Sequence, residues 1–403
     1  MLTRINCLLC TLLVCLTAST VWGQSSLAEF QKALQEKAAF QATDFAALKL
    51  NQPIVRLAPT SDKREIAVSG LVSVRAGVEE FLSSYRESMT QKTDHAILEA
   101  GSFSSEPSIN DLASLTLDAR DIEDLKACVV GDCQLKLSAP MIERFRNQIK
   151  WDAPDYQLAA TNLFKQMLLE YVRDYRTRGD AALIEYNDKP DGISVATEQQ
   201  ALNAASSYVN DLLTRTKSEL QLADDSIVWS KIKFGLKPVI AINHVRIYRR
   251  SRDAGPQALI ASNQIYANHY FNASLALTAF VNVPGVDQGA YLVYENRSRA
   301  DGLEGPFGKL KRGVVEKKAL EGLKAILAHS QASLGGSPLT ASTEDYVSYE
   351  SYAWGQRLFG GIRPLLWLLV LSALIALSLL GKRRVDNVNS SKAKALKPES
   401  AKS

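Results

Sequence analysis

The longest regular pattern in the chain is an alternation of apolar and polar residues over 264–281. Every second residue from Ile265 is apolar except one histidine, and the residues between them carry mainly hydroxyl, amide or aromatic groups. A period of two is typical of a strand with one buried face. We therefore predict one long antiparallel strand here, bent or broken by a bulge. Its apolar face includes Ile265, His269, Phe271 and Leu275.

Neighbouring segments extend this picture to an α+β fold. Strand patterns occur at 239–248 and again at 290–297, after a Pro-Gly turn, and 307–329 has the apolar spacing of an amphipathic helix. A block at about 139–222 is mostly helical by the same criterion. We predict an antiparallel sheet with a long C-terminal helix packed on it, plus a helical insertion.

An apolar segment lies near each end of the chain, and together the two predict its localisation. Residues 1–23 have one basic residue, an apolar core and a small terminal residue, as a secretory signal peptide does. We place the cleavage after Gly23, and a retained N-terminal anchor is the alternative. Residues 364–381 would span about 27 Å as a helix, which is enough for one transmembrane crossing.

Charge predicts the orientation of that crossing. The tail from Lys382 holds seven basic and two acidic residues, a net +5, whereas the whole chain carries +4. Basic flanks favour the cytoplasmic side, so the main domain would be extracytoplasmic, and periplasmic in a Gram-negative cell. The exported part is then slightly acidic, and it lacks the net positive charge that is typical of nucleic-acid-binding domains. We expect a single-pass protein of the cell membrane.

These segments define a linear organisation. The predicted parts are a signal peptide (1–23), an exported α+β domain (24–330), a Ser/Gly/Thr-rich tether (331–361), a transmembrane helix (362–381) and a basic cytoplasmic tail (382–403).

The exported part contains one pair of cysteines, Cys128 and Cys133. A close pair in an exported chain favours a disulfide that closes a small loop. Free thiols are the alternative, and a zinc site lacks a second pair of ligands nearby. We predict no metal site and no cofactor.

The sequence contains no recognisable catalytic motif. Ser230 and Lys233 match a Ser-x-x-Lys pattern, but no companion motif follows them. His269 and His244 lie in strand patterns without a paired acid at any recognisable spacing.

His269 is either a core residue with one hydrogen-bond partner, or a group that anchors the polar end of a ligand or acts as an acid or base. His244 shares its strand face with Arg246 and Tyr248, so we expect it to be half solvated. We predict no catalytic residue.

The order of elements over 239–330, with 64–75 as a first strand, resembles the helix-grip architecture of START-like lipid-binding domains. That resemblance implies a sheet wrapped around the last helix with an apolar cavity between them. The runs 260–271 and 291–299 also resemble an uncharacterised family of bacterial exported proteins, which implies no activity.

Three functional hypotheses follow. The first is a membrane-tethered binding protein for a lipid or another apolar ligand. Its predicted ligand-binding residues are His269, Phe271, Ile265, Leu275 and His244. The second is an envelope scaffolding or protein-interaction module with a protein partner. The third is an enzyme that uses the two histidines.

Overall fold

The structure, a computed structural model, describes residues 27–49, 52–90, 97–206, 220–234, 237–250, 255–283, 289–304 and 308–335. All of them belong to the first of the two units into which the chain divides, residues 1–340. The predicted signal peptide, transmembrane helix and basic tail lie outside the described residues.

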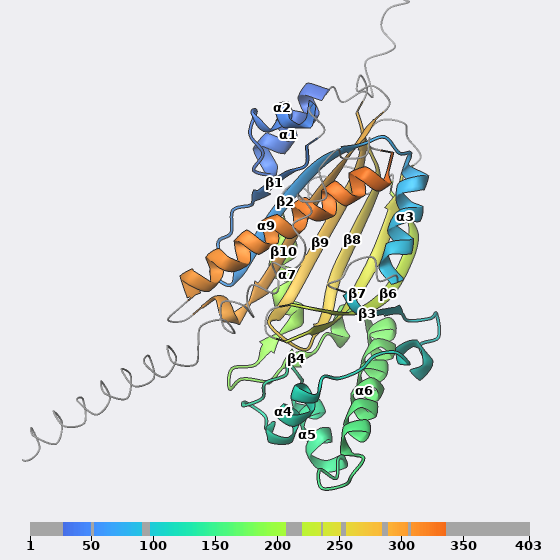
Figure 1. Cartoon of the computed structure of the whole chain (residues 1–403), viewed down its shortest axis with the longest axis vertical. Helices are drawn as coiled ribbons and strands as arrows, with labels where there is room; N and C mark the ends of the chain where they lie inside the picture. Colours follow the sequence, from blue (N-terminus) through green and yellow to red (C-terminus); the bar gives the residue numbers. More distant parts are fainter. Residues whose placement is uncertain are drawn as a thin grey trace, which may run out of the picture. The chain divides into compact units, whose positions relative to one another are not determined.

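An eight-stranded antiparallel sheet organises the described residues (Figure 1). Its strands lie in the order β1-β2-β10-β9-β8-β7-β6-β3. Their bounds are β1 (Ile54–Leu57), β2 (Glu65–Val74), β3 (Ile97–Ser102), β6 (Gln221–Ile232), β7 (Val239–Arg249), β8 (Gly255–Ala267), β9 (Phe271–Asn282) and β10 (Ala290–Ala300). Two short strands, β4 (Glu185–Tyr186) and β5 (Ile193–Ser194), form a separate pair.

The segment predicted as one long strand is divided between two strands. The chain turns at residues 268–270, so that β8 and β9 pair with each other as a hairpin. His269 therefore lies in the turn, and the prediction that it lies on an apolar strand face is wrong. The prediction missed the turn because apolar and polar residues alternate both before and after it, and no Gly or Pro marks its position.

Helices cover both faces of the sheet. The back face, which carries Leu275 and Val293, packs against helices α1 (Leu27–Lys37), α2 (Asp44–Lys49) and α7 (Val195–Ala205). The front face packs against α9 (Gly308–Ser333), which lies along β1 and β2, and against α3 (Val78–Thr90). Phe81 of α3 stacks on Phe280 of β9 with ring centroids 5.4 Å apart.

A helical block with its own core lies against one end of the sheet (Figure 1). It contains η1 (Ile109–Leu112), α4 (Ala119–Ala127), α5 (Ala139–Gln148), α6 (Tyr156–Arg178) and η2 (Gly179–Ala182). Its core continues into the sheet, because Trp229 and Tyr266 are buried with the apolar residues of α6. A third short helix, η3 (Asp301–Leu303), follows β10.

The predicted fold class and localisation need correction. No helix among the described residues is both long and apolar enough to cross a membrane. The two longest, α6 and α9, carry charged residues along their lengths, which a hydrocarbon core would not accommodate. The segment 362–381 lies outside the described residues. The structure supports an α+β fold with a large antiparallel sheet, and neither the transmembrane helix nor the single-pass localisation is supported.

The predicted helix-grip arrangement is corrected as well. The helix predicted at 307–329 is present as α9, Gly308–Ser333, and it packs on the front face. It lies along β1 and β2, at one side of the sheet.

Gly70 allows α9 to approach β2 closely. A Cβ atom at Gly70 would lie 2.5 Å from Leu327 Cδ1 and 3.1 Å from Leu323 Cδ2. Both leucines are buried, so they have little room to move away. The approach of the helix to the sheet therefore depends on the absence of a side chain at this position.

We expect Gly70→Ala to lower the free energy of unfolding by about 1–3 kcal/mol through overpacking. Gly313→Ala, in the exposed part of α9, meets no atom within 4 Å and should instead leave stability unchanged or raise it by up to about 1 kcal/mol. Urea denaturation of both variants measures this. Equal stabilities for the two variants would contradict the close approach.

Candidate functional site

The turn between β8 and β9 has an unusual backbone. Tyr270 has a φ of 60°, and the Phe271 amide donates to the His269 carbonyl at 2.7 Å. A hydrogen bond between residues two apart, around a residue of positive φ, is the rare and strained form of the γ-turn. For a bulky residue, positive φ costs about 1–3 kcal/mol, and such strain gathers at functional sites.

Hydrogen bonds from two directions hold this turn in place. The Ile240 amide donates to Asn268 Oδ1 at 2.7 Å, and the Asn268 amide donates to the Ile240 carbonyl at 3.0 Å. The Lys136 amide, from the loop before α5, donates to the Asn268 carbonyl at 2.9 Å. The strained turn is thus tied to both β7 and the helical block.

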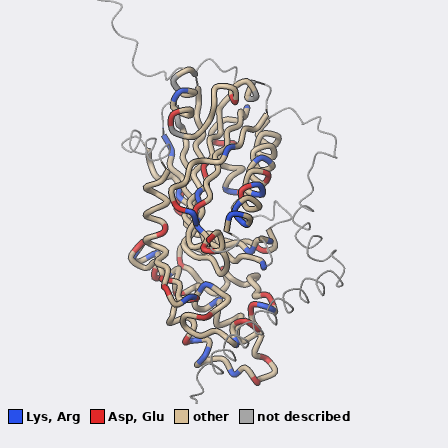
Figure 2. Tube along the Cα trace, turned by 90° about the vertical axis from the view of Figure 1, so that its left-hand side faces the viewer, with Lys and Arg blue, Asp and Glu red and all other residues tan. Residues whose placement is uncertain are grey.

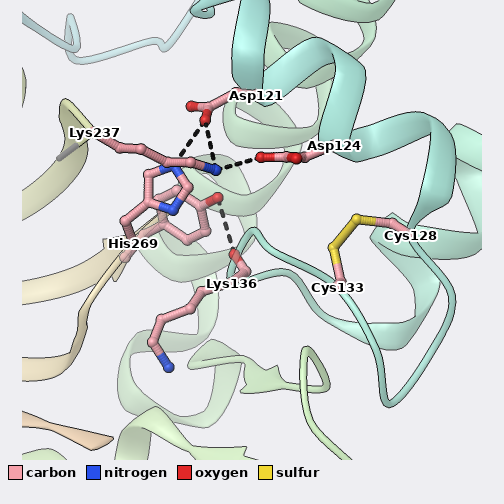
Figure 3. Close-up of a disulfide and its surroundings, with 8 residues drawn as sticks. Asp121, Asp124, Cys128, Cys133, Lys136, Lys237 and His269 are labelled. Atoms are coloured by element: carbon pink, nitrogen blue, oxygen red, sulfur yellow. Dashed lines mark hydrogen bonds and ion pairs between the residues drawn. A yellow bond between two sulfur atoms is a disulfide. The ribbon is translucent and has the colours of Figure 1, made fainter. Parts of the chain in front are cut away.

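The disulfide supports the same loop. Cys128 is bonded to Cys133, and the loop that they close lies just before Lys136. The Cys133 amide donates to the Asp188 carbonyl at 3.0 Å. Figure 3 shows the disulfide close to the residues that surround the turn.

Three aromatic rings gather beside the turn on the front face. Phe234 lies 5.0 Å from Phe271 and 5.7 Å from Tyr270, measured between ring centroids. We call Phe234, Tyr270 and Phe271 the aromatic cluster. All three are half-buried, and they pack against the buried residues Val239, Ala241 and Ala267. Apolar ring surface therefore remains accessible here.

Charged residues also gather at the turn (Figure 3). His269 Nε2 is 3.0 Å from Asp121 Oδ1, and the Lys237 ammonium is 3.6 Å from the same oxygen. Asp124 also binds Lys237. His269 and Asp121 are only 4% and 2% exposed. We call these four residues the ion cluster.

The ion cluster has the chemistry of a structural anchor. Among the described residues, the imidazole of His269 bonds only to Asp121, whose other oxygen accepts from Asn268 Nδ2 at 3.2 Å. Within the described ranges, the hydrogen-bond and ion-pair partners of this pair are Asn268 and Lys237, and neither carries the hydroxyl or thiol that nucleophilic catalysis would need. A buried charge is stable only when it is paired and hydrogen-bonded. The contacts of Asp121 with His269 and Asn268 therefore join α4 to the turn.

The structure separates the five predicted ligand-binding residues. His269 and Phe271 lie together at the turn. Ile265 is fully buried in the core of the helical block, and Leu275, 5% exposed, is buried in the back-face core. His244 lies on β7, against α6. The apolar residues are apart because a bulge in β8 and the turn direct them to different cores.

Sequence reasoning missed Tyr270, Phe234, Lys237 and Asp121. The adjacent rings of Tyr270 and Phe271 next to a histidine were a usable signal. The Asp121–His269 pair had none, because 148 residues separate its members.

His244 occupies a second polar arrangement. Its Nδ1 lies 2.9 Å from the Tyr175 hydroxyl, and its Nε2 lies 2.9 Å from Asp225 Oδ1. Burial raises the pKa of Tyr175 to about 12, so the phenol stays protonated near neutral pH. Burial also lowers the pKa of His244, against the raising effect of Asp225. The imidazole is therefore neutral near pH 7 and bonds α6 to the sheet.

Charges of both signs are interspersed over the described part of the chain in the view of Figure 2.

No protein-family model matches the chain, and no curated protein is significantly similar to it.

Removal of the disulfide tests its contribution to the site. We expect the double variant Cys128→Ser, Cys133→Ser to lose about 2 kcal/mol of unfolding free energy, because the closed loop is short. Urea denaturation of the oxidised protein, the reduced protein and the variant measures this loss. If the variant loses unfolding free energy but the reduced wild-type protein does not, the introduced serines cause the loss and the disulfide does not.

His244 gives a pH dependence. Its pKa is lowered on folding, so the unfolded chain binds the proton first as the pH falls. We expect the free energy of unfolding to be constant above about pH 7 and to decrease as the pH falls through the unfolded pKa of about 6.5. The free energy of unfolding of the His244→Gln variant should decrease less than that of the wild-type protein between pH 7.5 and 5.5. Parallel curves for the two proteins would contradict this assignment.

Proposed function

We propose that this chain is a non-enzymatic binding protein for a ligand with an apolar part, such as a lipid, and that the aromatic cluster holds that part. The observation that carries the proposal is the strained turn at Tyr270, which keeps three rings together and half-exposed at the front face. Ring surface left in water is a cost that ligand contact would remove.

The ion cluster supports a role in positioning these rings. Tyr270 and Phe271 follow His269 directly, and the Lys237 amide donates to the Tyr270 hydroxyl at 3.0 Å. The His269 ring also lies 5.8 Å from the Tyr270 ring, so the ion cluster contacts the aromatic cluster directly. A rigid presentation lowers the entropy lost when a ligand binds.

The alternative, a protein-interaction module, stays a prediction. The observation that favours it lies on α9, where Leu310 and Val314, one helical turn apart, are 70% and 51% exposed. The enzyme hypothesis gains no support, because the two histidines lie in separate arrangements and each bonds to side chains of the fold.

The test of the proposed function uses N-phenyl-1-naphthylamine, an uncharged apolar probe, titrated into the purified chain by fluorescence. We expect Phe234→Ala and Phe271→Ala each to weaken binding about tenfold, which is about 1.4 kcal/mol.

Trp151→Ala is the matched control, because Trp151 is a half-buried ring paired with Tyr156 in the helical block, 6.1 Å between centroids. It should leave the affinity unchanged. The proposal fails if the wild-type chain does not bind the probe, or if all three variants weaken binding equally. Thermal unfolding of each variant shows whether it is folded.

A further inference from the structure

Next to the aromatic cluster, the front face of the sheet carries half-buried residues on β9 and β10. Every second residue along the middle of β9 and β10 points to this face and is half-buried, whereas the residues between them are buried against the back-face helices. The half-buried positions on this face of β9 are Ser274, Ala276 and Thr278. This part of the sheet is thus covered on one side and accessible on the other.

Hydroxyl and amide groups lie along this part of the front face. Register places six of them on the same face of β7 to β10. They are Asn243, Ser262, Gln264, Ser274, Asn296 and Ser298, which we call the polar belt. No charged side chain occupies the described front-face positions 258–264 of β8, 274–280 of β9 or 290–300 of β10.

Hydrogen bonds organise one end of the polar belt. The hydroxyls of Ser274 and Ser298 lie 2.8 Å apart across β9 and β10. Asn296 Nδ2 donates to Ser274 at 3.2 Å, and Ser298 donates to Asn296 Oδ1 at 2.9 Å. These groups are held in fixed positions and retain lone pairs for a ligand.

The other end of the polar belt has an unsatisfied donor. Gln264 is only 5% exposed, and its Nε2 has no hydrogen-bond partner among the residues that the structure describes. A buried amide without a partner costs about 1–3 kcal/mol, which a ligand oxygen at this place would recover. Gln264 pairs with Asn243 across β7 and β8, so two amides face the same place.

The polar belt and the aromatic cluster adjoin each other. Ala241 lies two residues before Asn243 on the same face of β7, and it packs in the cluster's base with Phe234 and Phe271. A ligand on the front face would therefore meet apolar rings at one end and neutral polar groups at the other.

We propose that the ligand is a lipid-like molecule with an uncharged, hydroxyl-rich headgroup, such as a sugar, which the polar belt binds while the aromatic cluster contacts the apolar part. This inference rests on the proposed function. A charged headgroup would lose its hydration without meeting a counter-charge, and a purely apolar ligand would leave the amides unsatisfied. Hydroxyls both donate and accept, and so match the mixed groups of the polar belt.

The test compares probes that share one tail and differ in the head. Octyl β-D-glucoside and octyl phosphate are titrated into the purified chain by calorimetry, below the concentrations at which they aggregate. We expect the glucoside to bind at least about tenfold more tightly. Gln264→Leu, which keeps the volume, and Ser274→Ala should each remove most of that preference.

Thr161→Ala, which removes a hydroxyl from the exposed side of α6, is the control and should keep the preference. If Gln264→Leu does not fold, Ser262→Ala takes its place. Equal affinity for both heads, with binding still lost in Phe271→Ala, would overturn the headgroup inference and leave the proposed function standing. No binding of either probe would overturn both.

Discussion

A buried ion network between β2 and β10 determines how the sheet presents its two faces. Arg297 donates to Glu65 Oε1 at 2.7 Å, and Arg299 donates to the other oxygen of the same carboxylate at 3.2 Å. These groups are almost completely buried, and breaking such a pair costs about 3–5 kcal/mol. A shift of one residue would carry both arginines to the front face. The network therefore selects the register that leaves neutral residues on the accessible side.

The same network connects the back-face helices to the sheet. Glu198 of α7 lies 3.6 Å from Arg299, and Ser206, just after α7, donates to Glu295 at 2.8 Å. Apolar contacts continue this layer, as where Phe30 of α1 stacks on Tyr291 at 5.3 Å. One face of β10 thus carries the charged residues that join it to β2 and to the back-face helices, and the other carries the hydroxyl and amide groups of the polar belt.

Contacts from several distant elements converge on the turn of the candidate site. The turn at Tyr270 is strained, yet it is held by β7, by the loop after the disulfide and by the Asp121–His269 pair. These contacts come from elements far apart in the chain, so each closes a long loop whose entropy the packed core must offset. Strain that persists under such restraint is a sign of a required geometry.

The sequence by itself determined the cysteine pair, the mixed α and β composition and the alternation that identifies β9 and β10, because these depend on local spacing and on the period of the side chains. It could not locate the turn at 268–270, since apolar and polar residues alternate on both sides of it. Only the tertiary structure decided that Ile265 and Leu275 enter different cores, and that Asp121 meets His269. Contacts of that kind depend on how distant segments pack, which local periodicity does not encode.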